Sequence, residues 1–83
     1  MSDELDILLV EDDIDTQANL TDILSLDGHR VHAANCFADV LESGTQTHIS
    51  LVILDRQLPD GVAEDRLPEL QELLPNAEFV VVT

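Results

Sequence analysis

The amino-acid sequence predicts a single α/β domain in which a parallel sheet is covered by helices on both faces. Unbroken apolar runs recur along the chain at 7–10, 51–54 and 79–82, and stretches with a helical spacing of apolar residues separate them. Strands that are buried on both faces read as continuous apolar runs, as in parallel sheets. Apolar residues make up 45% of the sequence and aromatic residues 2%, which suits an aliphatic α/β core. A chain of 83 residues has no room for a second domain.

The first half of the chain reads as strand, helix, strand. The run at 7–10 predicts a buried strand. From Ile14 to Leu26 apolar residues recur at intervals that place them on one face of a helix, and Gly28 stands where a helix often ends. Val31–Ala34 is a weaker strand candidate, and its mixed polarity suits the edge of the sheet.

The second half continues the alternation. A short helix is expected from Asn35 to about Ser43, ahead of the strand at 51–54, and a longer one up to Leu74. Pro68 fits the first turn of a helix better than its middle, so the longer helix is predicted to begin at 65–67. The run at 79–82 then completes a fourth strand, and the connections are short enough for right-handed crossovers.

Composition excludes several classes of function. The formal charge is −15, from 18 acidic residues against three arginines and no lysine, so nucleic acid and anionic membrane surfaces are poor partners. Cys36 is the single cysteine, so no intramolecular disulfide forms and a reducing compartment is expected. No apolar run approaches the roughly 18 to 20 residues that cross a bilayer, so we expect a cytoplasmic protein.

Polar residues follow each of the buried strands. Glu11, Asp12 and Asp13 come after the first run, Asp55 after the second and Thr83 after the last. Ligands of open α/β sheets bind outside the carboxyl ends of the strands, so these side chains are expected to converge at one edge. A single acid directly after a strand is commonly the N-cap of the next helix. Asp13 is either such a cap or an acid that lies behind the metal-binding carboxylates. Convergence from three strands is hard to explain by capping alone.

The chemistry of this cluster indicates a divalent metal ion. Close carboxylates raise each other's pKa unless a cation joins them. Mg²⁺ takes one or two carboxylates and completes its coordination with water, carbonyl and phosphate oxygens, which fits Asp12 and Asp55 with Glu11 nearby. A carboxylate at the end of a rigid strand is also a nucleophile toward phosphorus, giving an acyl phosphate when the metal screens its charge. Thr83 is then expected to donate a hydrogen bond to the phosphoryl group.

Three segments resemble the receiver domains of response regulators in two-component signalling. They are Leu9–Asp13, the stretch Leu54–Gly61 with its Leu-Asp-x-x-Leu-Pro-x-Gly pattern, and Val80–Thr83. The central pattern is fairly specific when an acidic doublet precedes it at this distance. The resemblance covers essentially the whole chain. It implies a flavodoxin-like, receiver-type fold with strand order 2-1-3-4.

The resemblance also implies a role for individual residues. Asp55 is the phosphoacceptor, Glu11 and Asp12 organise Mg²⁺, Gln57 offers its backbone carbonyl to the ion, and Thr83 is the switch hydroxyl. The implied activity is self-catalysed phosphoryl transfer within a phosphorelay, followed by a conformational signal, and not enzymatic turnover. The implied partners are a histidine kinase or phosphotransfer protein as donor and an output domain of unknown type, in a response regulator or a hybrid kinase.

The sequence also departs from the family pattern. The family continues through a helix, a fifth strand ending in a lysine and a last helix, none of which is present, so residues 1–83 are expected to hold an incomplete receiver domain. The strand at 79–82 then becomes an exposed edge through which copies of the chain can associate. Because this lysine is missing, the alternative is a pseudo-receiver, which is an interaction module that works without phosphorylation. An aspartyl-phosphate hydrolase ranks lower, because such enzymes place a second acid where Gln57 stands.

Overall fold

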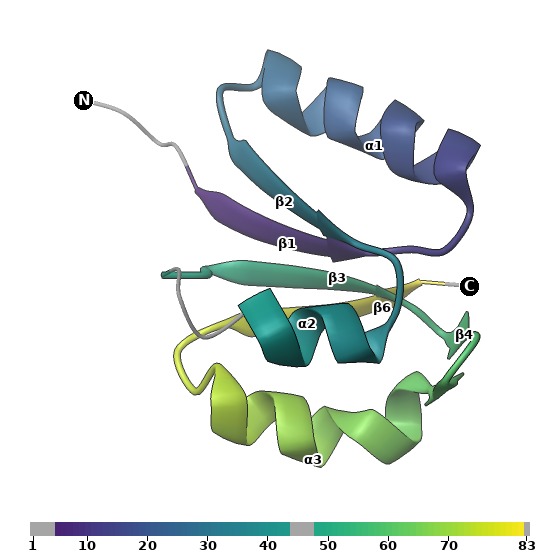
Figure 1. The fold of residues 1–83 in the computed structure, drawn as a ribbon. Coiled ribbons are helices and arrows are strands. Elements are labelled where there is room, and N and C mark those ends of the chain that lie inside the picture. The colour runs from purple at the N-terminus through teal and green to yellow at the C-terminus, as the bar shows by residue number, and fades with distance from the viewer. Residues whose placement is uncertain (1–4, 44–47, 83) are drawn as a thin grey trace.

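The computed structural model describes residues 5–43 and 48–82, and within them a four-stranded parallel sheet forms the centre of the fold (Figure 1). The strand order is β2-β1-β3-β6. The strands span Asp6–Val10 (β1), Arg30–Ala34 (β2), Leu51–Asp55 (β3) and Glu78–Val82 (β6). Every neighbouring pair runs parallel. The predicted fold class and strand order are confirmed, with β6 as the fourth strand of the prediction.

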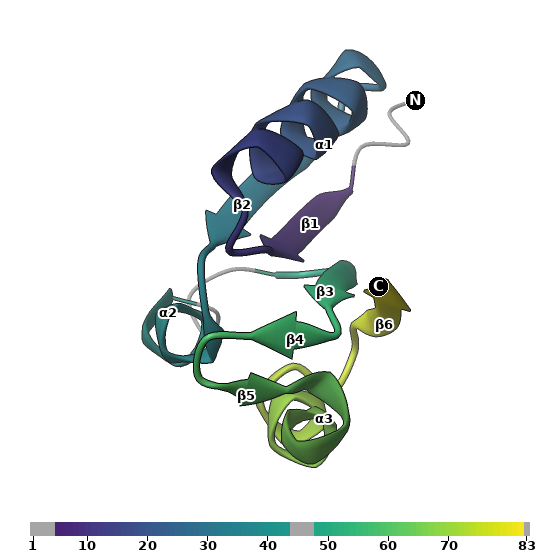
Figure 2. The ribbon, with the colours of Figure 1, turned by 90° about the vertical axis from the view of Figure 1, so that its right-hand side faces the viewer.

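Within the described residues, three helices cover the two faces of this sheet. They are α1 (Ile14–Leu26), α2 (Phe37–Ser43) and α3 (Ala63–Leu73). Figures 1 and 2 show α1 on one face, and α2 and α3 together on the other. Among the helices of the described ranges, none combines the length and apolar character that a bilayer crossing requires.

Most of the core lies between the sheet and the pair α2 and α3. Strand residues alternate between faces, and one set packs on this side together with residues of both helices. The buried cluster includes Leu8, Val10, Val52, Leu54, Phe37, Val40 and Leu70. On the other face Ile7 and Leu9 are buried, but α1 contributes no buried residue, and its Ile14 and Leu26 are largely exposed. Much of the apolar face that the sequence predicted for this helix is therefore exposed.

Two features differ from the prediction and both follow Asp55. A short antiparallel hairpin, β4 (Gln57–Leu58) with β5 (Gly61–Val62), was not predicted. The predicted start of α3 at 65–67 was wrong, because the helix begins at Ala63 and Pro68 lies inside it. The fully buried Ala63 donates its backbone N–H to the carbonyl of Arg56 at 2.8 Å, a contact that holds the first residue of the helix in place.

Candidate functional site

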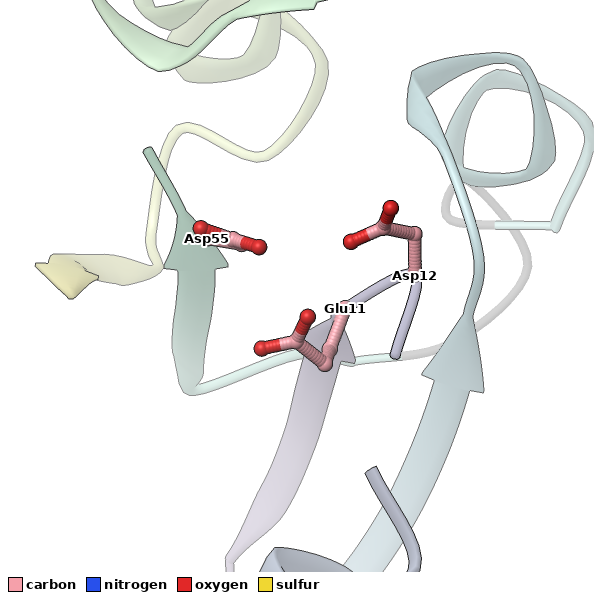
Figure 3. Close-up of side chains that lie close together, drawn as sticks. All are labelled: Glu11, Asp12 and Asp55. Atoms are coloured by element: carbon pink, nitrogen blue, oxygen red, sulfur yellow. The ribbon is translucent and has the colours of Figure 1, made fainter. Parts of the chain in front are cut away.

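Three carboxylates meet at the carboxyl edge of the sheet. Glu11 and Asp12 directly follow β1, and Asp55 is the last residue of β3. Because β1 and β3 pair in register up to Val10 and Leu54, the two strand ends lie side by side. An oxygen from each of the three carboxylates lies within 4.8 Å of the others, and Figure 3 shows them turned toward a common space.

Backbone contacts hold Glu11 at the centre of this group. Its N–H donates to the carbonyl of Ala34 at 3.0 Å, and its side chain accepts a hydrogen bond from the N–H of Asp13 at 3.1 Å. Glu11 is 7% exposed. Burial raises the pKa of Glu11, and the neighbouring Asp55 carboxylate raises it further, while the hydrogen bond from Asp13 opposes both. A cation at this edge would relieve the cost of keeping the group charged.

Asp13 has a structural role at the start of α1. Its carboxylate accepts from the N–H groups of Asp15 at 3.0 Å and Thr16 at 3.5 Å, which makes it the N-cap of the helix. Of the two roles that the sequence left open for Asp13, the structure shows the helix cap. Asp13 still lines the same hollow as the three clustered acids. This acidic hollow, of about 640 Å³, is bounded by Glu11, Asp12, Asp13, Thr16, Leu20, Asp55 and Val82.

A second hollow also borders Asp55. It has a volume of about 470 Å³ and is lined by Asp55, Arg56, Gln57, Val62 and Glu64. The N–H of Gln57 donates to the Asp55 carboxylate at 3.3 Å, so the chain folds back toward the carboxylate directly after β3. Thr83 lies outside the described residues, and its predicted hydrogen bond to a phosphoryl group stays a prediction.

Asp60 has a role that sequence reasoning missed. Its carboxylate accepts hydrogen bonds from the N–H groups of Phe37 and Ala38, both at 3.1 Å. The loop after Asp55 thus caps α2, a helix that has the non-capping Cys36 before it. Burial alone would raise the pKa of Asp60. The hydrogen bonds from these amides and the positive charge of Arg66 outweigh it, so the pKa of Asp60 is lowered. The lack of a capping residue at 36 was the one signal available in the sequence.

The donor set fits the ion that the sequence suggested. In the described part of the chain, Glu11, Asp12 and Asp55 form the one group of three potential metal-binding side chains. All the donors are carboxylate oxygens, which hard cations such as Mg²⁺ and Ca²⁺ prefer. Histidine and cysteine, which favour zinc and copper, are absent from the group. The residues present therefore fit a magnesium ion.

Solved structures of receiver domains resemble this chain. The non-phosphorylated HemR receiver domain from Leptospira biflexa is 30% identical, with a TM-score of 0.84 over 93% of this chain and 62% of its own. A response regulator receiver domain protein from Clostridium thermocellum is 25% identical, with a TM-score of 0.84 over 93% of this chain and 63% of its own. The chain therefore spans less than two-thirds of either structure.

A third similar structure was solved with beryllium trifluoride bound. The MaeR response regulator bound to beryllium trifluoride is 28% identical, with a TM-score of 0.83 over 100% of this chain and 67% of its own. No family model and no curated protein matches the chain.

Proposed function

We assign the chain to the receiver-domain family of response regulators, and we propose that it accepts a phosphoryl group on Asp55 with the help of Mg²⁺. The convergence of Glu11, Asp12 and Asp55 within 4.8 Å at the carboxyl edge of the sheet carries this proposal. The position agrees with the general place of ligands in open α/β sheets. The similarity to solved receiver domains supports the same role.

The proposed transfer uses the carboxylate of Asp55 as the nucleophile. One of its oxygens forms a bond to phosphorus, the bond from phosphorus to the donor's phosphohistidine nitrogen breaks, and the electron pair leaves with the imidazole. Glu11, Asp12, Asp55 and the backbone carbonyl of Gln57 would hold the ion. Mg²⁺ bound there supplies positive charge that lets an anionic nucleophile approach an anionic phosphoryl group.

The partners follow from this chemistry and are part of the proposal. A histidine kinase or a phosphotransfer protein supplies the phosphoryl group, an output domain receives the signal, and Thr83 is the switch hydroxyl. The net charge of −15 disfavours nucleic acid and anionic membranes as partners of this domain. We place the protein in the cytoplasm, where kinases of this kind present their phosphohistidine. We also propose that residues 1–83 correspond to the first part of the receiver domain.

Acyl phosphate formation tests the proposal directly. Incubation with phosphoramidate and Mg²⁺ is expected to add one phosphoryl group per chain, as read by intact mass, and the adduct should be cleaved by hydroxylamine. Asp55→Asn and chelation of Mg²⁺ should each abolish the adduct. Asp65→Asn, a matched change at an exposed acid on α3, should leave it unchanged. Labelling of the Asp55 variant to the native level would refute the assignment.

The alternative function is that of a pseudo-receiver. A pseudo-receiver would keep the fold and the acids but act as an interaction module without phosphorylation. Titration with beryllofluoride, which mimics a phosphoryl group, separates the two. A phosphoacceptor binds it only together with Mg²⁺ and only with Asp55 intact, whereas a pseudo-receiver does not bind it.

A further inference from the structure

The chain has three arginines and no lysine, and one of the arginines adjoins the proposed acceptor. Arg30 pairs with Asp6 at 2.9 Å at the opposite end of β1. Arg66 donates to the carbonyl of Asp60 at 3.1 Å and lies 5.7 Å from the ring centre of Phe37. Arg56 is left as the basic residue that lines a hollow together with Asp55.

The backbone of Arg56 is fixed while its side chain is free to change partner. Its N–H donates to the carbonyl of Val82 at 2.9 Å, and its carbonyl accepts from the N–H of Ala63 at 2.8 Å. The guanidinium Nε lies 3.4 Å from a carboxylate oxygen of Glu64, and the two side chains are 58% and 55% exposed. Exposed ion pairs of this kind contribute little free energy, so exchanging Glu64 for a stronger anion costs little.

The two hollows beside Asp55 differ in charge. The acidic hollow is lined by Glu11, Asp12 and Asp13 and by no basic residue, whereas the second hollow is lined by Arg56 and Glu64. A phosphoryl group brings a charge of about −1.5 to −2 and several strong acceptor oxygens. A metal ion among the acids would neutralise one side of that group. In the second hollow, the positive charge available to phosphoryl oxygens is the guanidinium of Arg56.

We propose that Arg56 provides this cation: once Asp55 carries a phosphoryl group, the guanidinium leaves Glu64 and binds the phosphoryl oxygens. The inference rests on the proposed function of Asp55. A guanidinium suits the contact because it is always charged and its planar fork matches phosphoryl oxygens. Glu64 is then a competitor that holds Arg56 in the unphosphorylated state.

Calorimetric titration with beryllofluoride and with Mg²⁺ alone tests this role. Arg56→Ala should weaken beryllofluoride binding in the presence of Mg²⁺ by about tenfold, the size expected for a charge-assisted hydrogen bond. The same variant should bind Mg²⁺ alone as tightly as the native chain or more tightly, because a nearby positive charge is removed. Glu64→Gln, which frees Arg56, should strengthen beryllofluoride binding. Arg30→Ala is the matched control and should change neither affinity.

The outcomes separate this inference from the function on which it rests. Equal beryllofluoride affinity of the native and Arg56→Ala chains would overturn the role of Arg56 and leave Asp55 as the acceptor. Loss of both beryllofluoride and Mg²⁺ affinity in that variant would show a purely structural effect and overturn it too. If the native chain does not bind beryllofluoride, or Asp55→Asn binds it as well, the proposed function itself fails.

Discussion

Asp60 ties the loop that follows the proposed acceptor to a helix that is distant in sequence. Its carboxylate accepts two backbone hydrogen bonds at the start of α2, from Phe37 and Ala38. Its carbonyl accepts from Arg66 of α3. One residue thus joins the loop to both helices on that face of the sheet. The next residue, Gly61, has a φ of 149°, which an L side chain rarely adopts.

Asp60→Ala is expected to lower the free energy of unfolding by about 1 kcal/mol, as for the loss of other N-cap residues. The pKa of Asp60 is lowered from its ordinary value of 3.8, so its stabilisation is fully present above that pH and is lost as the pH falls through the lower pKa of the folded state. The destabilisation should therefore be larger at pH 6 than at pH 3. Urea unfolding followed by far-ultraviolet circular dichroism measures both.

The matched control for Asp60 is Asp65→Ala, which removes an exposed acid whose side chain caps no helix in the described structure. It should change stability by no more than a few tenths of a kcal/mol. A loss in Asp60→Ala that is the same at both pH values would contradict the capping role, because a protonated carboxyl is a far weaker acceptor.

The site residues differ in how far they could be predicted. Glu11, Asp12 and Asp55 were predicted to converge because parallel strands end at the same edge of a sheet, and the structure brings them together. The contact of Asp60 with α2 could not be predicted in this way. It joins residues 22 and 23 positions apart, and no periodic pattern marks such a pair.

At the scale of elements, α3 carries a proline where a helix is least tolerant of it. The helix begins at Ala63, so Pro68 lies in its second turn. A proline there has no N–H to donate to the carbonyl of Glu64, and its ring crowds the preceding turn. The sequence placed Pro68 in the first turn on these grounds. The helix instead begins at Ala63, where the backbone N–H bonds to the carbonyl of Arg56, a tertiary contact that the position of a proline does not reveal.

Pro68→Ala should therefore stabilise the protein. Alanine restores a helical N–H, and its helix propensity exceeds that of proline by about 3 kcal/mol, partly offset by the greater freedom of the unfolded chain. We expect a net gain of about 1 to 2 kcal/mol in the free energy of unfolding, read from urea denaturation. Pro75→Ala, in the turn after α3, is the control and should lose about 0.5 kcal/mol. A loss of stability in Pro68→Ala would mean that the helix is adapted to its proline.

The strands and helices themselves were predictable to different degrees. Continuous apolar runs identified β1, β3 and β6, as expected of strands that are buried on both faces. This reason holds for β1 and β3, which are largely buried, whereas β6 is apolar in sequence but mostly exposed at the edge of the sheet. The hairpin of β4 and β5 was not predictable, since two-residue strands carry no periodicity to detect.

At the scale of the whole molecule, the two faces of the sheet are covered unequally. Figure 2 shows α1 lying over β1 and β2, with β3 and β6 beyond it on that face. Val80 and Val82 of β6 are 45% and 38% exposed. They point away from the face of Phe79, which packs against the core with α3. Exposed apolar side chains thus adjoin an edge strand, a combination that favours association.

The backbone of β6 shows how a second chain would be added. Glu78 donates its N–H to the carbonyl of Ser50, and Val82 accepts from the N–H of Arg56. Peptide groups alternate in direction along a strand, so the N–H groups of Phe79 and Val81 face the other side. In the described structure that side is an edge of the sheet.

We therefore expect the 83-residue chain to self-associate through β6, with a weight-average mass in sedimentation equilibrium that rises with concentration. Val81→Pro removes an outward N–H and leaves the hydrogen bonds to β3 intact. It should weaken association at least about tenfold, because the added chain loses a hydrogen bond and also meets the proline ring. Val81→Thr keeps that N–H and a β-branched side chain, and should associate like the native chain. A native chain that stays monomeric at all concentrations would contradict pairing at this edge. Equal association of the proline variant would instead place the contact on the exposed face of Val80 and Val82.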